Sequence, residues 1–131
     1  MEVVTDASAL VAVITNENRR QALIRSSKGA DLIAPASVHW EIGNALSAML
    51  KRGRIGPPQV AEAIAAYEQI PLRFVDVELD ESLVIAAELD LYAYDAFLLR
   101  CALKYRSPLL TLDRGLVHAA KQLDVAIVEV E

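Results

Sequence analysis

The stretch that decides the fold is EVVTDAS, which spans residues 2–8. Its first four residues form a short apolar segment, which predicts a buried strand over residues 2–5. An aspartate, Asp6, follows this strand directly. A second apolar segment, residues 109–112, is followed in the same way by Asp113. Because a solvated charge has little reason to follow a buried strand, we treat both carboxylates as candidate site residues.

The rest of the chain alternates predicted helices with predicted strands. This alternation is typical of a parallel sheet covered by helices on both faces, and therefore of an α/β fold. We expect further strands over residues 31–34, 73–77, 108–112 and 125–130. We expect helices over residues 7–15 and 17–27 with a break near Asn16, over 38–52 with Ser37 as N-cap, from Pro58 to about Gln69, over 80–89, from Tyr94 to about Tyr105, and over 114–122.

Length and composition limit the class of protein. The chain has 131 residues, enough for one compact domain with a core, so we expect residues 1–131 to form a single domain. Hydrophobic residues make up 54%, yet no apolar run approaches the roughly 20 residues of a membrane-spanning helix. The N-terminal residues contain no basic region typical of a signal peptide, and we expect a cytoplasmic protein.

Charge and residue types limit the kinds of site that the chain can form. The net charge of −5 argues against a general nucleic-acid-binding surface. The total nearly balances once four candidate site acids are set aside, so charge alone neither supports nor excludes an RNA or DNA substrate. The single cysteine, Cys101, excludes an internal disulfide and is expected to be buried. His39 and His118 lie in separate predicted helices without the spacing of a zinc site.

Two more acids lie on the apolar faces of predicted helices. Glu41 is three residues after Val38 and four before Ala45, so it shares their inward face. A capping box with Ser37 would require the acid at position 40 and therefore does not explain it. Asp95 heads a similar apolar stripe in the helix expected from Tyr94 to about Tyr105.

Each acid also has a purely structural explanation. Asp6, Asp95 and Asp113 could act as helix N-caps, and Glu41 could complement the helix dipole. No single position decides between the two explanations. Together, however, the four acids come from elements that meet outside the carboxyl ends of parallel strands, where ligand sites of open α/β sheets form. Such a group of carboxylates predicts a site for a hard divalent cation.

Four motifs, taken in order, resemble those of PIN-domain ribonucleases. They are VVTDASAL over residues 3–10, EIGNAL over residues 41–46, YDAF over residues 94–97 and LTLD over residues 110–113. The order, the spacing and the total length are similar to the VapC-like toxins of toxin–antitoxin pairs. The likeness covers nearly the whole chain.

The resemblance implies a three-layer αβα fold with a parallel sheet of about five strands. It also implies cleavage of RNA with Mg²⁺ or Mn²⁺, a small antitoxin protein as inhibitor, and a homodimer. In this interpretation Asp6, Glu41 and Asp95 hold one metal, and Asp113 completes that site or helps to hold a second metal. The metal activates a water for hydrolysis of a phosphodiester bond.

Four other residues are candidates for supporting roles. Ser8 could position a ligand or a phosphate, and Asn44, one turn after Glu41, could orient its carboxylate. Thr111 could add a hydroxyl, and Arg114 could contact a substrate phosphate.

A domain of this length and fold class could also have a function other than RNA cleavage. The main alternative is a catalytically inactive PIN-like protein-interaction module. A receiver-like phospho-acceptor domain would require paired acids after the first strand, and a haloacid-dehalogenase-type phosphatase would require aspartates two residues apart. The sequence TDAS at residues 5–8 provides neither pattern.

Overall fold

The computed structural model describes residues 1–130, which form four strands and seven helices. In chain order these elements are β1 (Glu2–Thr5), α1 (Ala7–Ile14), α2 (Arg20–Ser26), β2 (Asp31–Pro35), α3 (Ser37–Lys51), α4 (Pro57–Glu68), β3 (Leu72–Val75), α5 (Leu79–Leu89), α6 (Ala93–Tyr105), β4 (Leu109–Leu110) and α7 (Arg114–Gln122).

The strands form one parallel sheet in the order β3-β2-β1-β4, as expected for an α/β fold. β1 is central, and it pairs Val4 with Ile33 of β2 and Thr5 with Leu110 of β4. Because the strands are parallel, the carboxyl ends of β1 and β4 lie at the same edge of the sheet. The segments that follow these two strands are therefore neighbours.

The expected fifth strand over residues 125–130 is reduced to a single parallel bridge between Leu109 and Ile127. Leu109 donates its N–H to the carbonyl of Ala126 at 2.9 Å and accepts from the N–H of Val128 at 2.9 Å. The prediction of a full strand was wrong because its partner β4 has only two residues. A strand this short cannot support a longer ladder on its outer side.

The helix termini confirm one local prediction and correct another. Asn16 has a φ of 59°, in the left-handed region, and separates α1 from α2 where we expected a break. Ser37, the expected N-cap of α3, is instead its first helical residue. Its buried Oγ has no hydrogen-bond partner among residues 1–130. The cap position falls to Ala36, directly after Pro35, the last residue of β2.

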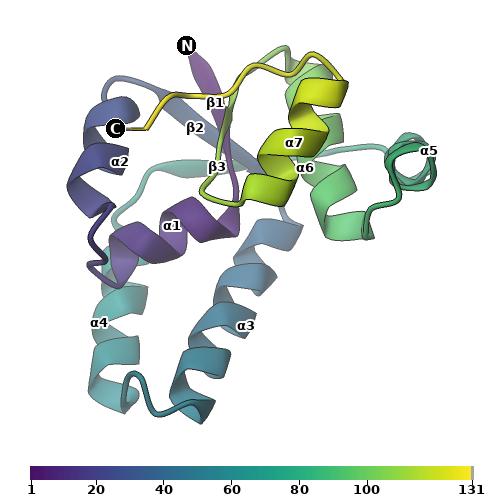
Figure 1. Ribbon diagram of the computed structural model, residues 1–131. Coiled ribbons are helices and arrows are strands. Elements are labelled where there is room, and N and C mark those ends of the chain that lie inside the picture. Colours follow the sequence, from purple (N-terminus) through teal and green to yellow (C-terminus); the bar gives the residue numbers. More distant parts are fainter. Residues whose placement is uncertain (131) are drawn as a thin grey trace.

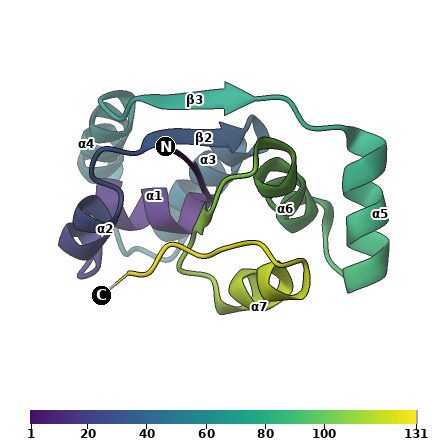
Figure 2. The same cartoon turned by 90° about the horizontal axis from the view of Figure 1, so that it is seen from above.

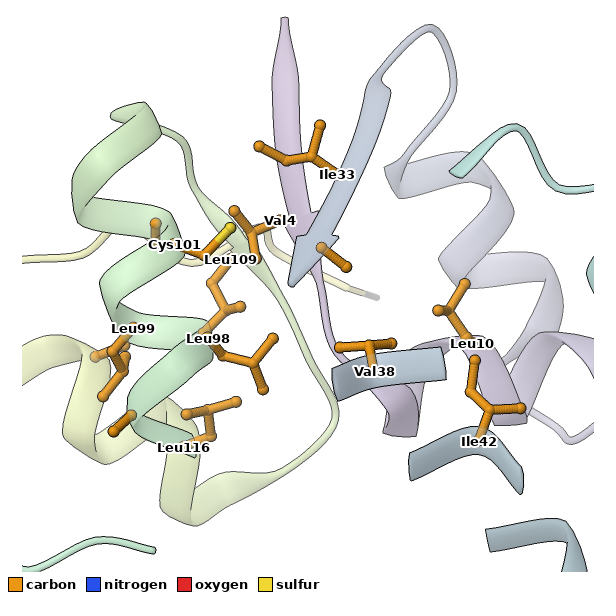
Figure 3. Packing of buried hydrophobic residues seen from close by; sticks show 14 of the residues in the cluster. Val4, Leu10, Ile33, Val38, Ile42, Leu98, Leu99, Cys101, Leu109 and Leu116 are labelled. Atoms are coloured by element: carbon orange, nitrogen blue, oxygen red, sulfur yellow. The ribbon is translucent and has the colours of Figure 1, made fainter. Parts of the chain in front are cut away.

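Helices cover both faces of the sheet, and the two views place α1, α2 and α4 on one side of β1 and α5, α6 and α7 on the other (Figures 1 and 2). Successive side chains of β1 point to opposite faces of the sheet and pack in two hydrophobic cores. Val4 belongs to the larger core and Val3 to the smaller one. The larger core contains Val4 and Ile33 of the sheet together with Leu98 of α6 (Figure 3). The fold is therefore layered as predicted.

The structure also bears on the expected burial of Cys101 and on the expected lack of a membrane-spanning helix. Cys101 is fully buried in α6, as predicted, and packs in the larger core. Among residues 1–130, no helix is both long enough and apolar enough to span a bilayer.

Candidate active site

β1 and β4 bring Asp6 and Asp113 to one edge of the sheet. The backbone N–H of Asp6 donates to the carbonyl of Leu110 at 3.2 Å, so the pairing of the two strands continues to the first acid. Asp6 caps α1 by accepting from the N–H of Ala9 at 3.0 Å. Asp113 caps α7 by accepting from the N–H of Leu116 at 3.1 Å. The capping explanation is thus correct for both residues, and it holds them at the same edge.

Asp6 is buried, with 4% of its surface exposed, and both of its carboxylate oxygens are engaged. The Ser8 hydroxyl lies 2.8 Å from Oδ1 and 2.9 Å from Oδ2, and the Thr111 hydroxyl donates to Oδ2. Ser8 and Thr111 are themselves tied to the second loop, because the N–H of Leu112 donates to Ser8 Oγ and that of Asp113 to Thr111 Oγ1, each at 3.0 Å. The two hydroxyls therefore fix the Asp6 carboxylate against the loop after β4.

Glu41 lies in the second turn of α3, and Asp95 lies in the first turn of α6. Both are partly buried, in contrast to Asp113, which is exposed. The Oε1 atom of Glu41 is fully buried and has no hydrogen-bond partner within residues 1–130. A buried carboxylate oxygen without a partner carries a desolvation cost, so this atom requires an explanation that packing alone does not provide.

The four carboxylates influence one another electrostatically. Burial, followed by the negative charges of Asp6 and Asp95, raises the pKa of Glu41 to about 7. Burial raises the pKa of Asp6, partly offset by its hydrogen bonds, and the charge of Asp113 raises it further. The pKa of Asp95 is raised by burial and then by Asp113. Each of the four acids therefore has two of the others as charged neighbours.

No basic side chain among residues 1–130 forms an ion pair with any of the four acids. The ion pairs formed within residues 1–130 involve other acids, such as Glu78 with Arg100 and Lys104. Within the same residues, no three acidic, His or Cys side chains are arranged to hold one ion in common by direct contacts. The donors present are nonetheless oxygen atoms only, which suits Mg²⁺ or Mn²⁺ held in part through water.

The predicted supporting residues differ in their placement. Ser8 and Thr111 are integral to the site through their bonds to Asp6. Asn44 is exposed and lines a cleft with Glu41, but no hydrogen bond joins the two side chains within the described chain. Arg114 is exposed beside Asp113 and forms no ion pair within residues 1–130.

The cleft beside Glu41 contains an aromatic residue that the sequence interpretation did not select. Tyr94, directly before Asp95, lines this cleft together with Trp40 and Asn44. The available signal was an aromatic residue directly before a candidate acid at the start of a predicted helix.

The comparison with known families decides the classification. The PIN domain model matches residues 3–122, which include all four acids. The chain belongs to the PIN-domain family. The family assignment supports a nuclease, and it agrees with the parallel sheet and its covering helices.

Two solved structures resemble this PIN domain. PAE2754 from Pyrobaculum aerophilum is 27% identical, with a TM-score of 0.74 over 97% of this chain and 83% of that one. VapC20 from Mycobacterium tuberculosis, a toxin that cleaves the sarcin–ricin loop, is 16% identical, with a TM-score of 0.65 over 89% of this chain and 94% of that one. The second likeness concerns the fold. No curated protein matches the sequence.

Proposed function

We propose that this PIN domain is a metal-dependent endoribonuclease that hydrolyses phosphodiester bonds with Mg²⁺ or Mn²⁺. The observation that carries the proposal is the buried, unpartnered Oε1 of Glu41 among like charges without a compensating cation. A divalent cation would supply the missing positive charge. It would be held by Asp6, Glu41, Asp95 and Asp113, partly through water, because Mg²⁺ usually keeps several of its waters in proteins.

The chain's own groups would orient the reaction. Ser8, Thr111 and the N–H of Ala9 donate to Asp6, which leaves its carboxylate little rotational freedom. In the metal-free protein, burial and the charges of Asp6 and Asp95 raise the pKa of Glu41 to about 7, so a cation that binds near neutral pH would displace a proton from this carboxyl. Arg114 is free to approach a substrate phosphate. When bound, the metal would lower the pKa of the attacking water and stabilise the negative charge on the leaving oxygen.

We propose further that the protein is the toxin of a toxin–antitoxin pair, acting in the cytoplasm as a homodimer that an antitoxin protein inhibits. The likeness of the fold to VapC20, a toxin that cleaves RNA, supports this proposal. Expression of the chain alone should then arrest growth, and co-expression of its antitoxin should relieve the arrest. Growth without arrest would favour a nuclease outside such a pair.

The direct test is RNA cleavage by the purified protein. Cleavage should require Mg²⁺ or Mn²⁺, stop with a chelator, and fall to the chelator background in Asp95→Asn. Asp90→Asn is a matched control, because Asp90 is an exposed aspartate that caps α5 outside the acidic cluster. Gel analysis of the RNA and circular dichroism of each variant would separate lost chemistry from lost folding.

The alternative of a catalytically inactive interaction module makes a different prediction. Such a module would show no metal-dependent cleavage, and Asp95→Asn would leave its behaviour unchanged. The four neighbouring acids argue against it, since an interaction module has no need for mutually repelling carboxylates, three of which are buried or partly buried.

A further inference from the structure

Two exposed aromatic side chains flank the cleft that contains Glu41. Trp40 precedes Glu41 in α3 and is 74% exposed, and Tyr94 precedes Asp95 in α6 and is 57% exposed. Asn44, one turn after Trp40, lines the same cleft with its amide. Each aromatic residue is thus adjacent in sequence to one of the proposed metal ligands, and both border one space.

Other aromatic rings contact these two side chains. The ring of His39 meets Trp40 edge-on, with centroids 4.8 Å apart, and His39 Nδ1 is hydrogen-bonded to the Tyr67 hydroxyl at 2.9 Å. The ring of Phe97 meets Tyr94 in a T-shaped arrangement at 6.1 Å. Neighbours of this kind restrict the rotamers of both side chains, which reduces the entropy lost when a ligand stacks on them.

We propose that Trp40 and Tyr94 form a stacking site for an unpaired nucleobase of the RNA, beside the phosphate to be cleaved. The proposal rests on the ribonuclease function and names its substrate class as single-stranded RNA. Aromatic faces bind the π-face of any base, and an amide such as that of Asn44 can both donate to and accept from a base edge. A base in a duplex is already paired and stacked, so only an unpaired base can enter.

The composition of the cleft favours RNA over a protein partner. The buried centres of protein interfaces are depleted of charged groups. This cleft is instead lined by Glu41 and by the polar residues Ser37 and Asn44, together with its two aromatic members. It is also continuous with the acidic site through Glu41, so a nucleotide bound here has its backbone next to the proposed metal ligands.

The binding experiment uses a built-in probe, because Trp40 is the single tryptophan of the chain. Oligouridylate is titrated into the Asp95→Asn protein with Mg²⁺ present, because this variant is expected not to cleave, so that binding is measured without cleavage and without repulsion from a metal-free acidic cluster. We expect saturable quenching of Trp40 fluorescence by the single strand and little by an RNA duplex. Equal quenching by the duplex would overturn the proposal.

Further substitutions in the Asp95→Asn protein show which side chains contribute to RNA binding. By anisotropy of labelled oligouridylate, Trp40→Ala and Tyr94→Ala should each weaken binding by roughly 5- to 150-fold, the range for one lost base stack. Trp40→Phe should retain most of the affinity. Tyr92→Ala is the matched control, since Tyr92 is 89% exposed but lies outside the cleft, and it should bind like the parent.

The outcomes separate this proposal from the ribonuclease function itself. Binding that depends on Trp40 in a protein that never cleaves RNA would support the stacking site and contradict the nuclease. Cleavage by the parent with unchanged RNA affinity in Trp40→Ala would contradict the stacking site alone. Unchanged RNA affinity combined with a change of oligomeric state in Trp40→Ala, measured by light scattering, would assign these aromatics to a protein interface and overturn the proposal.

Discussion

Glu41 makes a distinctive contribution to the pH dependence of stability. Its pKa is raised from 4.5 to about 7 by burial and by the charges of Asp6 and Asp95. Between these two values the folded chain binds more protons than the unfolded chain, so stability decreases as pH rises through this window. The ionised carboxylate is therefore a cost to the fold that protonation, or a bound cation, removes.

We predict that without divalent metal the free energy of unfolding falls between pH 5 and pH 8. The Glu41 share is about 1–2 kcal/mol, after allowing for solvent screening of its partly exposed side chain. Denaturant titrations in EDTA at several pH values would measure it. Glu41→Gln should flatten the pH profile, whereas Glu62→Gln on the exposed face of α4 should leave it unchanged. A Glu41→Gln profile as steep as that of the parent would contradict the assignment.

At the scale of the element, Asp113 combines a structural role with a proposed chemical one. It caps α7 through its Oδ1 and also raises the pKa of Asp6 and Asp95 by its charge. Asparagine caps a helix about as well as aspartate but carries no charge, whereas alanine cannot cap. Two substitutions at one position can therefore separate the two roles.

We predict that Asp113→Ala lowers stability by about 1 kcal/mol through loss of the cap, and that Asp113→Asn leaves stability nearly unchanged. Both variants should cleave RNA about ten- to a hundred-fold more slowly, because both remove a charge from the metal site. Thermal unfolding and cleavage rates measured side by side would test this. Parental cleavage by Asp113→Asn would restrict the residue to capping.

The elements also show what the sequence could predict and what it could not. The periods of apolar residues predicted the parallel sheet, the break at Asn16 and the placement of Asp6 and Asp113, because these depend on local pattern and chain direction. The prediction of a strand over residues 125–130 was wrong, because the length of that strand depends on its partner β4, which has only two residues. The sequence of a segment does not determine how long the strand that it pairs with will be.

The site was predictable to a similar degree and for similar reasons. Spacing placed Glu41 and Asp95 on inward faces, and the structure confirms that they are partly buried near the other acids. The bond from Thr111 to Asp6 joins residues 105 positions apart and depends on the pairing of β1 with β4. The cleft shared by Trp40 and Tyr94 depends likewise on how α3 and α6 approach each other, which no local pattern encodes.

Across the whole molecule, the proposed metal site would couple metal binding to folding. The chain carries a net charge of −5, and the cluster concentrates four negative groups without an ion-pair partner among residues 1–130. An unfolded chain separates these groups and binds a hard cation weakly. Metal binding therefore favours the folded state by an amount that grows with the logarithm of metal concentration.

We predict that Mg²⁺ at about 100 times its dissociation constant stabilises the protein by about 2.7 kcal/mol, which raises Tm by roughly 10 °C. Glu41→Gln should reduce this gain, because it removes one charged oxygen ligand while leaving the backbone in place. Calorimetry across a Mg²⁺ series would measure the shift, with NaCl at matched ionic strength as the control. If NaCl raised Tm equally, the gain would be general screening of surface charge, and the four carboxylates would not form a specific cation site.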